Sequence, residues 1–375
     1  VSSGDTLDLN GQRMECSGLL TNAGTMDLDG GLIFAADYNL DASYDNESGL
    51  IGMVMTGATT FDFGDGEFTH GTFMVNSAGT CTMEADHTLA NLLVGAGTLA
   101  MGADQDNAMT GLTVATGGTL TASSATLTNS GDFTTSGGLI GKSAYDFDGA
   151  SGYIDCGSDS SIENIFDGGG TLEAWINTDS DGEGDLGRVL HKAAGWYLAV
   201  RGESGGKVKL EFAGYFSGTN GVWRTTSTDI TNSKWHHVAL TYNNGNVAND
   251  PTIYVDGKQV AIDEVTTPVG TRTSDNSVTL YIGNNGTSDS RTFDGRIAMV
   301  RLFTDIRTET EIRTDMFNDF ASMDSTHLLA AMYQFDEGTG TSLDDVSTNS
   351  NVGTITAGSS AWASAGTFTY GTSTL

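Results

Sequence analysis

The chain has 375 residues, which leaves room for two or three domains, each able to bury its own core. Its formal net charge is −32, from 48 acidic and 16 basic residues. A charge of this size excludes nucleic acid and anionic membrane surfaces as partners. The 51 glycines and only two prolines indicate an all-β protein in which tight turns join many short strands.

Two further features bound the class of protein. No run of about 18 apolar residues exists, so we expect no membrane insertion. Cys16, Cys81 and Cys156 are odd in number and widely spaced, which predicts small buried side chains rather than disulfides. Because the first residue is Val1 and not Met, we expect a processed product or a fragment, and the lack of a signal peptide says nothing about compartment.

Residues 1–140 repeat one glycine-led phrase with a spacing near 20 residues. Three of the four intervals between successive copies are 20, 18 and 20 residues, and the fourth, of 55, has room for two or three degenerate copies. The phrases are "GDTLDL" at Gly4, "GTMDL" at Gly24, "GTCTM" at Gly79, "GTLAM" at Gly97 and "GGTLTA" at Gly117. This spacing predicts a β-solenoid, whose stacked coils need apolar side chains only on their inner faces. A β-sandwich built from hairpins of similar length is the alternative.

Residues 141–320 contain six strand-like phrases in a defined order. They are "SAYDFDGASGYIDCG" from Ser143, "TLEAWINTD" from Thr171, "WHHVALTYNNG" from Trp235, "IYVDGKQV" from Ile253, "LYIGNNG" from Leu280 and "FDGRIAMVRLF" from Phe293. This order resembles the laminin-G-like, concanavalin A-like lectin family. The resemblance implies a jelly-roll β-sandwich over residues 141–320.

The adjacent histidines His236 and His237 lie in one of these phrases. Neighbouring side chains of a strand point to opposite faces of its sheet, so these two cannot easily bind one metal ion. We therefore expect both to be structural. The Asp256–Gly257 pair that follows is predicted to form a two-residue hairpin turn.

The resemblance also implies a calcium site, since relatives often hold the ion through carboxylates and loop carbonyls. The acidic pair that relatives carry after the last strand's glycine is missing here, where the chain reads Ile297-Ala298-Met299. Asp148 and Asp294 remain as candidate calcium ligands. Each belongs to an Asp-Gly pair, so an ordinary turn is the alternative reading.

A glycan site is predicted near the phrase "YFSGTNGVWRTT". Tyr215 and Trp223 place aromatic side chains beside a polar, glycine-rich loop, the type of surface on which sugars stack. The alternative for Trp223 is an ordinary core position.

Catalytic motifs are not found in the sequence. Glucanases of this fold carry a Glu-x-Asp-x-x-Glu strand, and the chain has no such phrase, no Gly-x-Ser-x-Gly, no His-Glu-x-x-His and no phosphate-binding loop. We therefore predict a protein without enzymatic activity.

The C-terminal residues 321–375 contain a second familiar phrase in an unusual place. "LLAAMYQFDEGTGTSLDD", from Leu328, precedes the sandwich in laminin-G-like relatives but follows it here, which indicates circular permutation or a truncated second copy. A short helix is predicted near 308–320, with Thr308 as N-cap, Glu311 three residues later, and Ile306, Ile312, Met316 and Phe320 near helical spacing. The final "AGTFTYGTSTL" repeats the solenoid phrase, so residues 362–375 are predicted to rejoin a solenoid.

Together these features predict a structural or adhesion protein at a virion surface or outside the cell. A solenoid that carries a lectin-like head resembles phage fibres, spikes and capsid decorations. The resemblance implies a cell-surface glycan and other virion or surface proteins, including further copies of the chain, as partners. The alternatives are a secreted bacterial adhesin or filament subunit and, second, a polysaccharide-degrading enzyme.

Overall fold

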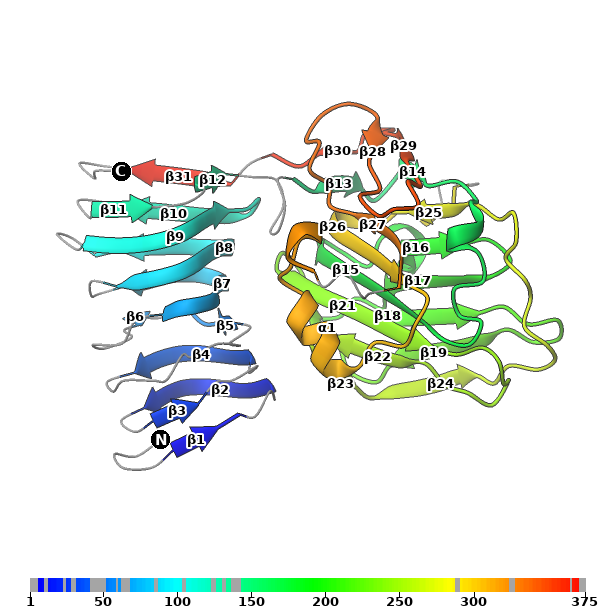
Figure 1. Cartoon of the computed structure of the whole chain (residues 1–375), viewed down its shortest axis with the longest axis horizontal. Coiled ribbons are helices and arrows are strands. Elements are labelled where there is room, and N and C mark those ends of the chain that lie inside the picture. Colours follow the sequence, from blue (N-terminus) through cyan, green and yellow to red (C-terminus); the bar gives the residue numbers. More distant parts are fainter. Residues whose placement is uncertain are drawn as a thin grey trace. The chain divides into compact units, whose positions relative to one another are not determined.

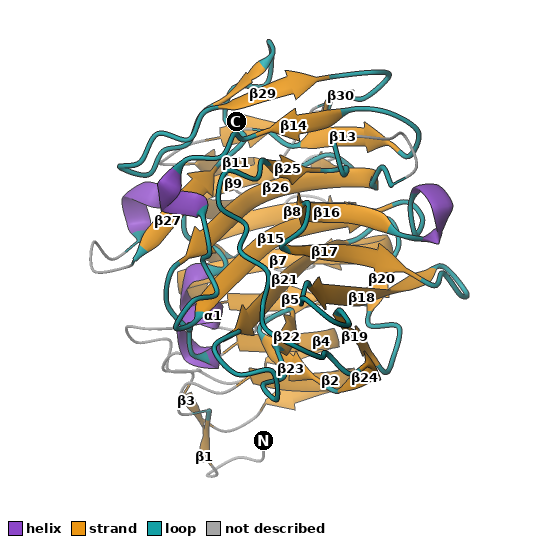
Figure 2. Ribbon diagram, turned by 90° about the vertical axis from the view of Figure 1, so that its right-hand side faces the viewer, coloured by secondary structure: helices purple, strands orange, loops and turns teal. Residues whose placement is uncertain are grey.

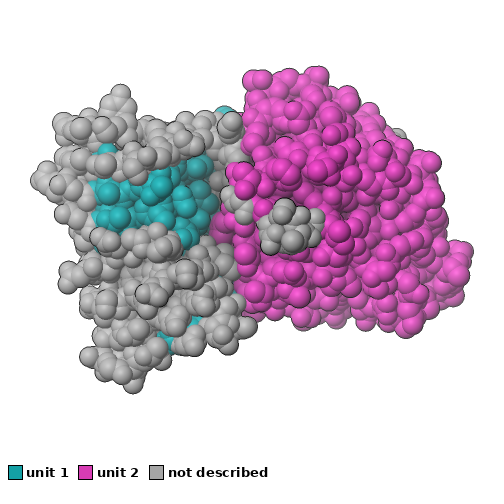
Figure 3. All heavy atoms as spheres, in the orientation of Figure 1, with its two compact units in different colours: residues 1–139, 364–375 teal, residues 140–363 magenta. Residues whose placement is uncertain are grey.

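The computed structural model forms two compact units, residues 1–139 with 364–375 and residues 140–363, shown in teal and magenta in Figure 3. It describes residues 6–9, 13–22, 25–27, 32–40, 52–58, 60–61, 68–83, 87–102, 106–122, 126–129, 133–135, 143–286, 291–323, 328–364 and 366–370.

The first unit is a β-solenoid-like stack of parallel strands (Figure 1). Its strands are β1 (Thr6–Asp8), β2 (Arg13–Asn22), β3 (Thr25–Asp27), β4 (Leu32–Leu40), β5 (Gly52–Met55), β6 (Thr60–Phe61), β7 (Phe68–Met83), β8 (Thr88–Met101), β9 (Asp106–Val114), β10 (Gly118–Ala122), β11 (Thr126–Asn129), β12 (Phe133–Thr135) and β31 (Thr367–Tyr370). Leu32 pairs with Gly52, and Gly52 pairs with Thr72. The chain thus advances by one coil every 20 residues here, and the interval without clear phrases still contains coils.

Columns of apolar side chains explain why so irregular a sequence stacks. Ile33, Met53, Phe73, Leu92 and Leu112 are successive register partners in β4, β5, β7, β8 and β9, and each is buried. Burying a side chain of this size contributes roughly 1.5–3 kcal/mol. Only this inward position must be apolar in each coil, so the repeat tolerates variation elsewhere.

The last strand of the chain belongs to the same unit. Thr367–Tyr370 (β31) pairs in parallel with Thr119–Ala122 of β10, with Thr119 opposite Thr367. The hydroxyl of Thr116 also donates to the carbonyl of Ser364. Residues 140–363 are therefore an insertion between two segments of one solenoid.

The second unit is an antiparallel sandwich of two sheets (Figures 1 and 2). One sheet has the order β23-β22-β21-β15-β26-β13-β30, with β27 also on β26, and consists of β13 (Tyr145–Asp148), β15 (Gly170–Thr178), β21 (Trp235–Tyr242), β22 (Thr252–Val255), β23 (Lys258–Val260), β26 (Asp294–Phe303), β27 (Leu329–Tyr333) and β30 (Ala361–Trp362). The other has the order β24-β19-β18-β17-β16-β25-β14-β29-β28, with β20 on β18, and consists of β14 (Tyr153–Asp155), β16 (Gly187–Lys192), β17 (Trp196–Arg201), β18 (Lys207–Gly214), β19 (Gly221–Thr225), β20 (Ile230–Thr231), β24 (Ile262–Thr266), β25 (Leu280–Ile282), β28 (Ser342–Leu343) and β29 (Gly353–Thr356). Alternating apolar residues of both sheets form one core.

The phrase that follows the sandwich strands completes both sheets. β27 pairs with β26, β29 with β14, and β30 with β13, where Tyr145 lies opposite Trp362. The amide of Ala363 donates to the carbonyl of Ala144 at 2.9 Å. The two ends of the unit therefore lie side by side, the geometry that an insertion into another fold requires.

One α-helix, α1 (Glu309–Asp315), lies within the predicted 308–320 segment. Thr308 caps it, and the reciprocal contacts of Thr308 and Glu311 form the predicted capping box. Three short 3₁₀ turns lie elsewhere, at Ser160–Ile162, Glu183–Asp185 and Phe320–Ser322. Ile312 and Met316 are buried, but Ile306 and Phe320 are largely exposed, so the predicted apolar stripe is wrong at its two ends because the helix stops at Asp315.

None of the helices in the described part of the chain has the length and apolar character needed to cross a membrane. All three cysteines are free thiols. Cys81 and Cys156 are buried, whereas Cys16 is only half-buried. Burial raises the pKa of Cys156 to about 12, so this thiol stays protonated and acts as a small apolar side chain.

Candidate functional site

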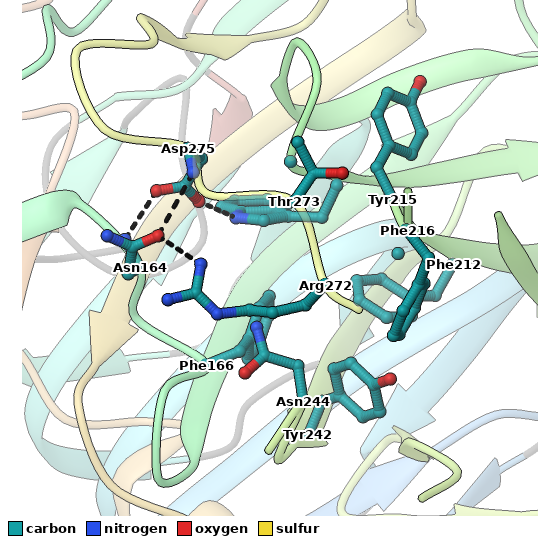
Figure 4. A pocket seen from close by; sticks show the side chains of 13 residues that line it. Asn164, Phe166, Phe212, Tyr215, Phe216, Tyr242, Asn244, Arg272, Thr273 and Asp275 are labelled. Atoms are coloured by element: carbon teal, nitrogen blue, oxygen red, sulfur yellow. Dashed lines mark hydrogen bonds between the residues drawn. The ribbon is translucent and has the colours of Figure 1, made fainter. Parts of the chain in front are cut away.

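A recess at one end of the sandwich is floored by aromatic side chains from four separate segments (Figure 4). Phe166 lies at the centre, with ring centroids 5.5 Å from Trp196 and 5.6 Å from both Phe212 and Tyr242, all edge to face. Phe216 completes the lining. The cavity volume is only about 10 Å³, which is room for about one water molecule.

Asp275 fixes the polar wall of this recess. Its carboxylate accepts hydrogen bonds from the Asn164 amide at 2.5 Å and the Trp196 indole at 3.0 Å, and it lies 3.3 Å from Lys192 Nζ. Both Asp275 and Lys192 are buried. Burial lowers the pKa of Lys192, although the neighbouring Asp275 charge opposes that shift. Asp275 is therefore a clamp between loops and not a free acid.

Asn164 ties a second loop to the same wall. Its backbone is in the left-handed region at φ 47°, which asparagine tolerates better than most residues. Its side-chain carbonyl accepts from Arg272 Nη1 at 2.7 Å and from the Asp275 amide at 3.1 Å. Arg272 also forms an ion pair with Asp167. The loops around residues 164 and 272 are thus held in one arrangement.

An open groove of about 570 Å³ shares three residues with the recess. Phe216, Asn244 and Arg272 line both. The remaining lining residues are small, polar or short apolar: Asp167, Gly168, Gly245, Asn246, Val247, Gly270 and Thr271. An aromatic edge beside amide side chains and glycine backbone can contact both the C–H faces and the hydroxyl groups of a polar ligand.

Uncompensated polar atoms mark the boundary between recess and groove. Among the described residues, the buried Asn244 Oδ1 accepts no hydrogen bond and the buried Tyr242 hydroxyl has no partner. Burial, with the charge of Asp250, raises the pKa of Tyr242 to about 12, so this hydroxyl keeps its proton. Buried polar groups normally have partners, so an unpaired acceptor here suits a bound hydroxyl group or water.

The predicted aromatic pair does not form one surface. Trp223 is fully buried, stacks 6.0 Å from Phe212, and donates from Nε1 to Asp250 at 2.7 Å. Its ring is not available to a sugar, because alternation along β19 directs it into the core, and the glycan assignment of Trp223 is corrected accordingly. Tyr215 lines the recess, but its ring points away from the aromatic floor in Figure 4 and lies 6.4 Å from Tyr197.

Asp148 and Asp294 face each other as register partners of β13 and β26. Asp148 Oδ1 accepts from the amides of Ala150 at 3.1 Å and Ser151 at 2.8 Å. Burial opposes ionisation, but these hydrogen bonds outweigh it and lower the pKa of Asp148. Asp294 Oδ2 accepts from Ser180 at 2.5 Å. The described residues contain no cluster of three or more His, Cys, Asp or Glu side chains suited to a metal, so calcium at this pair stays a prediction.

The two histidines have separate structural partners. His236 Nδ1 lies 2.7 Å from Asp256 Oδ2, and its Nε2 accepts from the Thr231 amide at 3.0 Å. His237, on the other face of β21, lies 3.5 Å from Glu173 Oε2 in a fully buried cluster. Asp256 is the first residue of the predicted hairpin turn, at φ 51°. The pair therefore does not converge on one ligand.

Acid chemistry is not assembled in the recess or the groove. The carboxylates among their described lining residues are Asp167 and Asp275, and both are engaged in ion pairs. Glycoside hydrolysis normally needs two carboxyl groups, one on each side of the scissile bond. The geometry of this site supports binding rather than cleavage.

Sequence and structure comparisons assign the sandwich to a family. Residues 148–313 match the laminin-G family model described as concanavalin A-like lectin/glucanases superfamily. No curated protein sequence is significantly similar to the chain.

Similar solved structures include a carbohydrate-binding protein of Bacteroides ovatus, described as putative (23% identity, TM-score 0.43, 61% of this chain and 60% of that one). The chain thus spans 60% of that protein's length. Two others are domain 4 of the Geobacillus stearothermophilus arabinanase AbnA with arabinotriose (19%, 0.35, 51% and 84%) and the CBM40 of the Ruminococcus gnavus IT-sialidase with α2,3-sialyllactose (14%, 0.34, 46% and 95%). Residues 148–313, by their match to the family model, form a laminin-G-like domain of the concanavalin A-like lectin/glucanases superfamily.

Proposed function

We propose that the sandwich is a non-catalytic carbohydrate-binding module and that its ligand lies in the loop-end groove. The observation that carries the proposal is a 570 Å³ groove lined by Phe216, Val247, two asparagines and three glycines. The membership of residues 148–313 in a lectin and glucanase superfamily gives the fold-level expectation.

Each type of lining residue has a role in such a complex. Phe216 and the exposed Val247 offer apolar surface to the C–H face of a sugar ring. Asn244 and Asn246 offer amide groups to sugar hydroxyls. Gly168 has φ +82° and open space where a side chain would lie, so a ligand can approach its backbone.

The absence of catalysis is proposed on the state of the local acids. Asp275 is buried and clamped by Lys192, Trp196 and Asn164, and Asp167 is paired with Arg272. Neither is placed as a general acid beside a second carboxylate. A polysaccharide-degrading enzyme is the competing function, and reducing-sugar release from cell-surface polysaccharides would reveal it.

We further propose that the whole protein is a surface-exposed structural or adhesion component, with a phage virion as the first candidate. A secreted bacterial adhesin or filament subunit is the second. The solenoid-like unit supports this role because a stack of parallel strands makes a protease-resistant rod, and the −32 charge keeps it soluble. The gene neighbourhood distinguishes the two settings.

A glycan array with the full chain, with and without EDTA, tests the binding proposal. The wild type is expected to bind a defined set of glycans. Val247→Trp, which fills the groove, should abolish the signal. Val352→Trp changes another exposed loop valine that does not line the groove, and it should leave binding intact. Equal binding by all three proteins would show that the groove is not the site, and loss of binding with EDTA would support calcium at Asp148 and Asp294.

A further inference from the structure

The charged residues of the groove suggest which sugars it accepts. Among its described lining residues only Asp167 and Arg272 carry charge, and the two form an ion pair. The Arg272 guanidinium is also held by Asn164 Oδ1 at 2.7 Å. The one cation in the groove is therefore neutralised and fixed before any ligand arrives.

We propose that the groove selects uncharged sugars and that Asp167 is the residue that excludes acidic ones. This inference rests on the proposed function of the groove. To reach Arg272, a uronate or sialate carboxylate would have to displace Asp167 and then remain beside its charge. Asp167 is partly exposed, with 43% of its side chain accessible, so the repulsion extends into the groove.

The unpaired acceptor points to the same ligand chemistry. Asn244 Oδ1 is buried, lines both cavities and accepts no hydrogen bond from the described residues. A sugar hydroxyl can donate to this oxygen, whereas a carboxylate or sulfate offers only acceptors. An acidic group at this position would leave the amide oxygen unpaired and opposed to a second acceptor.

The charge of the whole chain acts in the same direction. At −32, the protein repels polyanions at a distance, and the groove has no free cation to reverse this locally. Binding of an uncharged sugar should therefore depend little on ionic strength.

The test compares neutral and acidic oligosaccharides on the full chain. The neutral probes are cellotriose, arabinotriose and lactose, and the acidic probes are trigalacturonate and α2,3-sialyllactose. The key variant is Asp167→Asn, which keeps a hydrogen-bond acceptor beside Arg272 but removes the charge. The matched control is Asp185→Asn, since Asp185 pairs with Arg201 away from the groove and has φ 57°, which asparagine tolerates.

The wild type is expected to bind at least one neutral probe and neither acidic probe. Asp167→Asn should improve the ratio of acidic to neutral affinity by about tenfold or more, in a salt-dependent manner. Asp185→Asn changes the net charge equally and should not alter that ratio.

Two results separate this inference from the proposed function. Wild-type binding of acidic probes in the groove, or an unchanged ratio in Asp167→Asn, overturns the inference and leaves sugar binding standing. If no probe binds and the array also shows no ligand that Val247→Trp abolishes, the proposed function fails, and the inference fails with it.

Discussion

Thr119 and Thr367 are register partners in the parallel strands β10 and β31, although residues 140–363 lie between them in the sequence. Gly366, just before β31, lies so close to the backbone carbonyls of Val114 and Ala115 that an added Cβ would clash. The end of the chain is thus fitted to a coil that formed much earlier in the sequence.

Deleting residues 364–375 should expose β10 while the sandwich stays folded. Removal of β31 leaves the Gly118–Ala122 backbone without one of its two neighbouring strands. Amide exchange in this strand should accelerate by roughly tenfold or more, with exchange in residues 143–363 unchanged. Unchanged protection of β10 would mean that β31 contributes nothing to the stack.

The fragment 140–363 should fold alone as a β-sandwich. Its ends are joined by the pairing of Tyr145 with Trp362 and by the Ala363 to Ala144 hydrogen bond. Circular dichroism should show β structure with one cooperative melting transition. A shorter fragment, 140–327, lacks β27–β30 and should not fold cooperatively, because β13, β14 and β26 each lose a partner.

Glu173→Gln should destabilise the protein at neutral pH. Glu173 lies fully buried, 3.1 Å from Arg301 Nη1 and 3.5 Å from His237 Nε2. Removing its charge leaves a buried guanidinium without its counter-ion, which costs roughly 3–5 kcal/mol in the free energy of unfolding. Glu264→Gln, at an exposed position on β24, is the control and should change stability by less than about 0.5 kcal/mol.

The same residue predicts a pH dependence. Burial opposes ionisation of Glu173, but His237 and Arg301 outweigh it and hold its pKa below the ordinary 4.5. The stabilisation is therefore complete above the pKa of the unfolded chain and is lost as the pH falls from about 4.5 through the folded pKa. Urea unfolding from pH 7 to pH 2 should show a steeper acid loss in the wild type than in Glu173→Gln. Parallel profiles would contradict this.

His236→Ala should lower the free energy of unfolding by roughly 1–3 kcal/mol, because it removes the contacts to Asp256 and to the Thr231 amide. A double-mutant cycle with Asp256→Asn should show coupling between the two residues. Zinc titration of wild type and variant should show no difference. A metal affinity that the variant loses would revive the reading of His236 and His237 as ligands.

Much of the architecture could be predicted from local patterns. The Trp235–Tyr242 strand, the Asp256–Gly257 turn and the capping box of Thr308 each depend on residues close in sequence. The solenoid period could be read because glycine and threonine recur at coil corners, although the inward columns vary between methionine, phenylalanine and leucine.

The candidate site could not be predicted in the same way. Asn164, Asn244 and Arg272 stand in three separate loops, and none belongs to a recognisable motif. Only the folded sandwich brings them together. Trp223 was ambiguous for another reason, since the sequence does not reveal which face of its strand is buried. Tyr215 marked the correct loop, but its ring points the other way.

Calorimetric titration of the best array glycan into wild type, Val247→Trp and Val352→Trp tests the central claim most directly. Binding in the groove predicts a saturable, single-site isotherm for the wild type and Val352→Trp, and none for Val247→Trp, with equal melting temperatures for all three proteins. Undiminished affinity in a folded Val247→Trp protein would contradict the claim that this groove is the sugar site.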